Sequence, residues 1–304
     1  MVQEHALCVE KSSLSESDAL EQAKPAAGAV ARQARRYTRC MPDTTDHEAA
    51  RRAGAPLVRT DGRRRTLEFA PGDIQSEMLL DRPDALVLEY TRAMMAFILF
   101  APHPRHIVMV GLGGGSLVKF CHRHLPAARI TVLEVRADVI ALREQFRVPP
   151  DDARLRVLHA DAAAYLAGTP DPADVVLVDG FDRGGLPAAL ASASFYASCR
   201  RVLRPGGVLV ANIFTYDPDY VSALQRLRTA FDGRVGWLRG VAGNNRILFA
   251  GPDAARGAAP TPGARRLAWL ARRGARHGCG AGWSNRLLVR LLVAWLARRP
   301  RSRG

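Results

Sequence analysis

The feature that most constrains this fold is a glycine-rich segment that directly follows a short apolar run. His106–Val110 has the sequence HIVMV, and Gly111–Ser116 continues it as GLGGGS. Apolar, β-branched runs of this length are typical of buried strands. Glycines let the backbone turn sharply and let a ligand approach with no Cβ in the way. A helix is expected from Leu117, and its N-terminal N–H groups would face that ligand.

A second predicted strand indicates which ligand this is. Ile130–Glu134 has the sequence ITVLE and places a carboxylate roughly 20 residues after the glycines. Nucleotide-binding sheets hold a ribose diol with an acidic side chain at this point. Glycines at a strand end also serve helix–strand packing, and that alternative explains the glycines alone but not the paired acid. The pair therefore predicts a nucleoside site.

Strands and helices alternate from residue 101 to residue 251. Beyond the first two strands, the expected strands are 155–158, 175–178, 208–213, 234–238 and 246–250. Such alternation is typical of a mainly parallel, doubly wound sheet with helices on both faces. We therefore predict an α/β domain over 101–251.

Residues 56–100 predict a small β cap and a leading helix. Thr66–Phe69 alternates between polar and apolar residues, Pro71-Gly72-Asp73 is a turn, and Ile74–Met78 is a further strand. Pro83–Phe100 carries apolar residues at helical spacing. Residues 1–55 are rich in Ala, Arg, Glu, Asp and Ser and have little apolar periodicity, so we expect a disordered N-terminal extension.

The net charge of +15 is concentrated after residue 251, where residues 252–304 hold twelve arginines and one acid, Asp253. No interleaving of aromatic residues supports base stacking, so we expect no nucleic-acid partner. Residues 252–263 predict a linker, and Ser284–Arg299 predicts an amphipathic helix in this basic tail. That helix either packs on the domain or on a second subunit of a homodimer, or lies on an anionic membrane surface.

Other classes of protein find little support in the sequence. The five cysteines are scattered without a CxxC pair, which favours neither a disulfide framework nor a zinc site. We find no signal-peptide pattern and no apolar run of about 20 residues. We expect a cytoplasmic protein with no metal and no tightly bound cofactor.

Four predicted strand ends carry groups that would meet at one edge of the sheet. They are Gly111–Gly115, Glu134, Asp161-Ala162 and Asp179–Asp182. Each aspartate alone could cap a helix, but capping does not explain acids at all three later strand ends. The glycine spacing is not the full dinucleotide pattern, so the ligand implied is an adenosine compound without a pyrophosphate. S-adenosylmethionine or a relative fits best, with Asp161 accepting from the adenine amino group.

These segments resemble the spermidine synthase (polyamine aminopropyltransferase) family, and more closely its bacterial spermidine synthase-like branch. The resemblance covers residues 57–250 and implies a Rossmann-like sheet of the class I methyltransferase type with a small N-terminal β cap. The segments that carry it are Ile74-Gln75-Ser76, Tyr90-Thr91-Arg92, Gly111–Ser116, Glu134, Asp161-Ala162, Val178–Asp182, and Ser194-Phe195-Tyr196 with the later Pro205-Gly206-Gly207 turn. The aspartate pair and the Phe-Tyr pair are the more specific part.

The resemblance implies transfer of an aminopropyl group from decarboxylated S-adenosylmethionine to an amine such as putrescine. It implies that Asp179 takes a proton from the amine and that Asp182 binds the diamine. A protonated amine cannot attack the carbon beside a sulfonium, so a carboxylate base also suits the chemistry on general grounds. The donor-binding residues implied are Gln75, Gly111, Gly113, Gly115, Glu134, Asp161 and Ala162.

Four positions depart from the family pattern. Gly114 stands where the family has an acid, Thr91 and Arg92 replace two polar donor-site residues, and Arg183 replaces a proline. Arg92 would bring positive charge near the donor and would suit a donor that keeps its carboxylate. An S-adenosylmethionine-dependent methyltransferase is therefore the main alternative, and a non-catalytic ligand-binding relative with a basic tail is a third interpretation.

Overall fold

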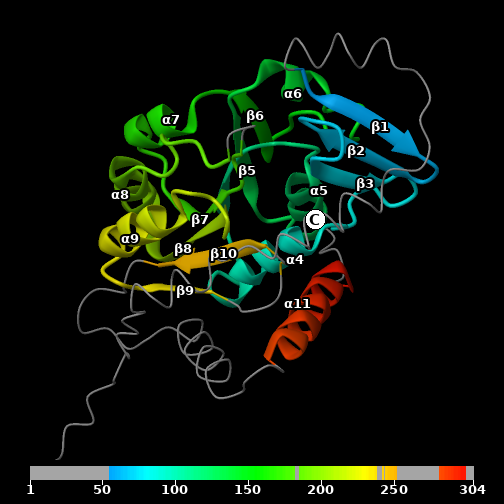
Figure 1. The fold of residues 1–304 in the computed structure, drawn as a ribbon. Coiled ribbons are helices and arrows are strands. Elements are labelled where there is room, and N and C mark those ends of the chain that lie inside the picture. The colour runs from blue at the N-terminus through cyan, green and yellow to red at the C-terminus, as the bar shows by residue number, and fades with distance from the viewer. Residues whose placement is uncertain (1–54, 182–184, 238–241, 243, 252–280, 299–304) are drawn as a thin grey trace, which may run out of the picture.

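The structure is a computed structural model that describes residues 55–181, 185–237, 242, 244–251 and 281–298 (Figure 1). It contains a small N-terminal sheet, a larger central sheet with helices on both faces, and a long C-terminal helix. The predicted N-terminal extension and the linker after residue 251 lie outside the described residues.

The small sheet is the predicted β cap. It has three antiparallel strands, β1 (Leu57–Asp61), β2 (Arg64–Glu68) and β3 (Ile74–Leu79), in that order. Leu67 and Met78 are buried beneath it. The Ser76 hydroxyl on β3 lies 3.3 Å from the Ser116 hydroxyl, which follows the glycine segment. The cap therefore sits against the glycine segment, as Figure 1 shows for β3 and α5.

The helix expected over Pro83–Phe100 begins later than predicted. Helix α4 spans Glu89–Met94 and continues as the 3₁₀ helix η1, Met95–Leu99. The carbonyls of Leu86 and Val87 each accept a hydrogen bond from Arg92 Nη1 at 2.6 Å. The prediction is therefore wrong for Pro83–Leu88, which begins as a turn closed by the Ala85 N–H and the Arg82 carbonyl at 3.0 Å and ends where Arg92 bonds the backbone.

The central sheet confirms the predicted α/β fold. It has seven strands in the order β6-β5-β4-β7-β8-β10-β9, parallel from β6 to β8 and antiparallel at β10 and β9. Its strands are β4 (His106–Val110), β5 (Arg129–Glu134), β6 (Leu155–His159), β7 (Ala173–Val178), β8 (Leu203–Phe214), β9 (Val235–Trp237) and β10 (Asn245–Ala250).

Strand β8 starts earlier than expected and includes the predicted Pro-Gly-Gly turn. Leu203 pairs with Ala173, and the next aligned pair is Val208 with Val175. The residues between them bulge out of the ladder, and Gly206 adopts a φ of +79° there. The turn is thus an excursion inside one strand, which extra residues on one side of a ladder produce.

Alternating side chains of the strands build two cores, one on each face. Ile107 and Met109 face the core that contains α4, η1, α5 and α11, whereas Val108 and Val110 face the core that contains α7, α8 and α9. The helices are α5 (Ser116–His124), α6 (Ala137–Ala141), α7 (Ala162–Gly168), α8 (Ala193–Val202), α9 (Tyr220–Ala230) and α11 (Ala281–Arg298).

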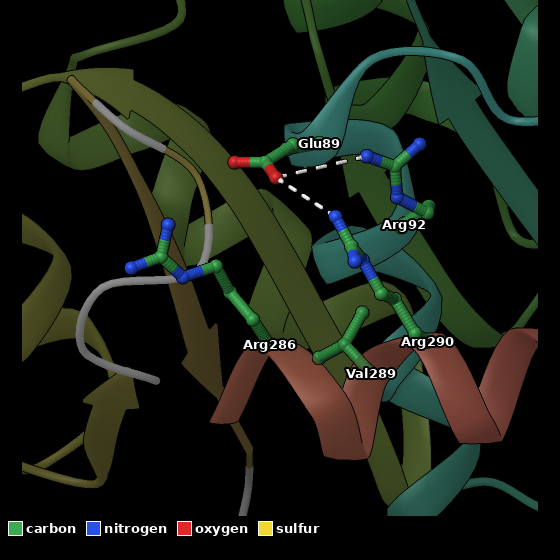
Figure 2. A pocket seen from close by; sticks show the side chains of 5 residues that line it. All are labelled: Glu89, Arg92, Arg286, Val289 and Arg290. Atoms are coloured by element: carbon green, nitrogen blue, oxygen red, sulfur yellow. Dashed lines mark ion pairs between the residues drawn. The ribbon is translucent and has the colours of Figure 1, made fainter. Parts of the chain in front are cut away.

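Helix α11 matches the amphipathic helix predicted over Ser284–Arg299. It packs on α4 and η1, and Val289 and Leu296 are buried there. Glu89 of α4 pairs with Arg290 of α11 at 3.7 Å and with Arg92 at 3.9 Å (Figure 2). Among the helices that the structure describes, none combines the length and apolarity needed to cross a bilayer.

Candidate functional site

A cavity of about 940 Å³ opens at the carboxyl edge of the parallel strands. Its wall is built from the cap, α4, the glycine segment and the ends of β5, β6, β7, β8 and β10. Most of the predicted site residues lie in this wall, namely Gln75, Gly111, Gly113, Glu134, Asp161, Ala162 and Asp179. Gly115 does not, and Asp182 lies outside the described residues.

Gly111 is a position where only glycine fits. Its φ is +91°, and a Cβ on it would lie 2.3 Å from the backbone oxygen of Asp179. The Asp179 N–H donates to the Val110 carbonyl at 2.9 Å, so the ends of β4 and β7 are bonded at this level. The missing side chain therefore lets Asp179 approach the glycine segment.

Gly114 and Gly115 serve packing, which was the alternative for this segment. A Cβ on Gly115 would lie 2.4 Å from Val148 Cγ2. A Cβ on Gly114 would lie 2.6 Å from Ser76 Oγ and 2.8 Å from Phe146 Cδ1. The acid that the family carries at Gly114 would not fit here without movement of the cap or of Phe146.

Glu134 ends β5 and is 7 % exposed. Its Oε2 accepts from the Leu112 N–H at 2.8 Å, and its Oε1 accepts from the Arg136 N–H at 2.9 Å. Each oxygen of a carboxylate can accept a second hydrogen bond. The two backbone bonds therefore orient Glu134 while leaving it able to bind the two hydroxyls of a diol.

Asp161 caps α7 in addition to lining the cavity. Its Oδ1 accepts from the Ala164 N–H at 2.7 Å, the bond expected of an N-cap residue. The capping alternative thus holds for this aspartate, and its remaining oxygen is available to a ligand.

Asp179 follows β7 and lies among neutral donors. Asn212 Nδ2 donates to Asp179 Oδ1 at 2.9 Å, and the Tyr90 hydroxyl, which donates to the Gln75 carbonyl at 3.4 Å, lies beside the carboxylate. Burial raises the pKa of Asp179 above its usual value, and the neighbouring Asn212 and Tyr90 side chains lower it in part. Burial and the neighbouring carboxylate raise the pKa of Tyr90 well above its usual value, so its hydroxyl stays protonated and donates.

Three asparagines in the wall, Asn212, Asn244 and Asn245, were not predicted as site residues. Asn212 lies on β8, and its signal is that it is a polar residue within the apolar run Val208–Ile213. Asn245 on β10 donates to Asn212 Oδ1 at 2.9 Å. No local pattern marks Asn245, because the antiparallel register of β8 and β10 brings the two together.

The wall of the cavity is acidic. Its charged residues are Asp73, Glu77, Glu89, Glu134, Asp161 and Asp179, and no Lys, Arg or His is among the described residues that line it. Two of these acids form ion pairs with arginines that do not line the cavity: Glu77 with Arg64, and Glu89 with Arg92 and Arg290. The charge of the wall is opposite in sign to that of the whole chain, which has 44 Lys and Arg residues and 29 Asp and Glu residues. Such a wall favours a cationic ligand.

Arg92 does not bring positive charge to this cavity. Its guanidinium lies in a crevice between α4 and α11, lined by Glu89, Arg286, Val289 and Arg290 (Figure 2). The expectation that it lies near the donor is therefore not met. Burial lowers the pKa of Arg92 within this crevice, and the nearby Glu89 carboxylate partly offsets that effect.

A sequence profile described as the spermine/spermidine synthase domain matches residues 88–232. A polyamine aminopropyltransferase of Chromobacterium violaceum is 39 % identical over 179 residues, which are 59 % of this chain and 69 % of the relative. The matched segment contains most of the cavity wall.

Two solved structures have a fold similar to that of this chain. A probable spermidine synthase from Corynebacterium glutamicum has a TM-score of 0.57 at 22 % identity, covering 77 % of this chain and 90 % of its own. Human methyltransferase-like protein 13 in complex with SAH has a TM-score of 0.52 at 24 % identity, covering 71 % of this chain and 95 % of its own. At these identities the likeness concerns the fold alone.

Proposed function

The chain belongs to the spermine/spermidine synthase family, and we propose on this premise that it transfers an aminopropyl group from decarboxylated S-adenosylmethionine to a small amine such as putrescine. The observation that carries the proposal is the acidic wall of the cavity. Both substrates are cations, because the donor bears a sulfonium and an ammonium and the diamine is protonated on both nitrogens. A wall of carboxylates in an otherwise basic chain suits both.

Asp179 is the proposed base. The carboxylate takes a proton from the ammonium of the acceptor, and the freed nitrogen attacks the carbon beside the sulfonium. The new C–N bond forms as the C–S bond breaks, and the electron pair of the C–S bond returns to sulfur in neutral methylthioadenosine. The raised pKa of Asp179 supports this role, because a base with a pKa nearer the working pH is the more effective.

The donor is proposed to lie along the glycine segment. Glu134 would hold the ribose hydroxyls with the acceptor capacity that its backbone bonds leave. Asp161 and Ala162 would border the adenine, and Gly111 and Gly113 would allow close approach. Gln75, whose side chain lies beside Asp73 in the same wall, would close over the ligand from the cap. The proposed role of Asp182 in binding the diamine rests on the resemblance alone.

The methyltransferase alternative is less well supported. S-adenosylmethionine carries a carboxylate that needs a cationic or hydrogen-bonding partner, and the described wall residues include no Lys, Arg or His. Arg92, the residue that favoured this alternative, bonds the Leu86 and Val87 carbonyls in the crevice beside α11. The third alternative, a binding protein without turnover, differs from the proposed enzyme in releasing no product, which the turnover measurement below tests.

The test compares the two donors and then turnover. Decarboxylated S-adenosylmethionine is expected to raise the melting temperature of the protein more than S-adenosylmethionine at the same concentration. Release of methylthioadenosine with putrescine present should follow. Greater protection by the undecarboxylated donor would favour a methyltransferase, and protection without product across a panel of diamines would favour a binding protein.

For partners beyond the amine, we propose that the outer face of α11 binds an anionic membrane surface. Leu287, Leu291 and Trp295 are spaced along this face and are 42 %, 59 % and 49 % exposed. Arg286, Arg290 and Arg298 flank them. Apolar residues bordered by arginines are typical of helices that lie in a lipid interface. A homodimer through the same face is the alternative, and vesicle binding and sedimentation separate the two.

A further inference from the structure

Two asparagine side chains connect Asp179 to strand β10. Asn245 Nδ2 donates to Asn212 Oδ1 at 2.9 Å, and Asn212 Nδ2 donates to Asp179 Oδ1 at 2.9 Å. Asn212 pairs across the ladder with Ile247, two residues from Asn245, so both amides project from the same face. Asn212 is 2 % exposed, and an unsatisfied amide there would be costly.

Donors and acceptors in this chain of side chains can be arranged in only one direction, because an amide has an oxygen on one side and N–H groups on the other. A carboxylate can only accept, so Asn212 must turn its N–H groups toward Asp179. The oxygen of Asn212 then faces Asn245 and needs a donor. If Asn212 were reversed, its oxygen would face the oxygen of a buried carboxylate, which is unfavourable.

We propose that Asn212 and Asn245 are positioning residues, with Asn212 holding the Asp179 carboxylate at the cavity and Asn245 fixing the orientation of Asn212. The inference rests on the proposed role of Asp179 as the base. The Tyr90 hydroxyl of α4, which donates to the Gln75 carbonyl at 3.4 Å, also lies beside the carboxylate. Among the described residues, Tyr90 is the titratable side chain that affects the pKa of Asp179, and β8 and β10 contribute neutral amides. The lone pairs that these donors leave unused are available to the amine.

Substitutions at Asn245 test the direction of the bonds without touching Asp179. In Asn245→Ala, Asn212 loses the donor that orients it, and kcat is expected to fall about 3- to 10-fold. The kcat of Asn245→Asp is expected to fall further, since the new carboxylate can only accept hydrogen bonds and would draw the N–H groups of Asn212 away from Asp179. In both variants the acid limb of the pH profile of kcat should move to higher pH, with KM for the donor unchanged.

Two outcomes would overturn the inference. If Asn245 bound the amine directly, Asn245→Asp would lower KM for the amine and leave the pH profile in place. The matched control is Thr215→Val, which removes the bond from Thr215 Oγ1 to the Asn244 carbonyl (3.1 Å) between the same two strand ends. This control is expected to keep kcat, and an equal loss in both variants would mean that loosening of the strands is the cause.

A second readout does not require turnover. Carbon NMR of the aspartate carboxyls, with the Asp179 signal identified by its loss in Asp179→Asn, should give a higher titration midpoint in Asn245→Ala and in Asn212→Ala than in the wild type. An unchanged midpoint would overturn the inference. If the wild type transfers no aminopropyl group, the proposed function fails while the midpoint still tests the amides.

Discussion

At the scale of single residues, Asp179 should govern turnover more than binding. Asp179→Asn keeps the shape of the side chain and removes both the proton acceptor and the charge. We expect kcat to fall by about 100- to 10,000-fold, the usual contribution of a general base. Calorimetry with methylthioadenosine should show that the nucleoside still binds. Turnover close to that of the wild type, with the nucleoside bound, would mean that Asp179 has a structural role only.

A separate prediction concerns the contribution of Lys119, on α5, to the stability of the fold. It is 4 % exposed, its Nζ donates to the Phe146 carbonyl at 2.7 Å, and burial lowers its pKa from 10.5 to about 7. The unfolded chain therefore binds more protons than the folded chain between about pH 7 and pH 10.5, and the contribution of Lys119 to stability rises with pH across this window.

Lys119→Met should remove this dependence while filling a similar volume. The free energy of unfolding of the wild type, relative to the variant, is expected to increase from pH 7 to pH 9 by up to about 1.4 kcal/mol per pH unit. Urea unfolding of both proteins at the two pH values measures it. Parallel pH dependences would show that Lys119 titrates normally.

At the scale of elements, the approach of β7 to the glycine segment depends on Gly111. Gly206, in the bulge of β8, has a similar φ of +79°, but a Cβ added to it would meet no heavy atom within 4 Å. Gly111→Ala should therefore lose more stability than Gly206→Ala, which suffers backbone strain of about 1–3 kcal/mol alone. Urea unfolding measures both. Equal losses would mean that β4 and β7 separate readily at this point.

The elements also show how far sequence patterns reach. Strands such as His106–Val110 were predictable, because burial on both faces makes them apolar along their whole length. Leu86 and Val87 fitted a helical spacing, yet they precede α4, because Arg92 bonds their carbonyls. The direction of Arg92 could not be predicted either, since it depends on α11, almost 200 residues later in the chain.

The site was predictable where it follows strand ends and not where it depends on strand pairing. Glu134, Asp161 and Asp179 each follow an apolar run, and the parallel sheet brings such ends together. Asn212 and Asn245 meet only through the register of β8 and β10. Gly115 matched the family pattern, yet in the structure it packs against Val148. The sequence could not distinguish the two roles, because a glycine with a positive φ can serve either a ligand loop or a close packing contact.

At the scale of the whole molecule, the basic tail should affect attachment more than chemistry. Deletion of residues 252–304 removes twelve arginines and no described residue of the cavity wall. Co-sedimentation with phosphatidylserine vesicles should be lost, and kcat should fall as well, because Val289 and Leu296 of the tail are buried against α4 and η1. Leu291→Glu, on the outer face of α11, leaves that packing in place, so we expect it to lose vesicle binding and to keep kcat within about threefold of the wild type. Equal vesicle binding with and without the tail would contradict the membrane proposal, and a change in sedimentation alone would favour a dimer.

The acidic cavity within a chain of net charge +15 has a consequence for the rate of encounter. A polyamine in solution is repelled by the whole molecule at long range and attracted only once it reaches the carboxylates. Salt screens charges beyond about 8 Å at physiological ionic strength and acts less on buried groups. Added salt should therefore weaken the repulsion first, so that the second-order rate constant for amine capture rises with ionic strength, opposite to the usual behaviour of an anionic site that attracts a cation.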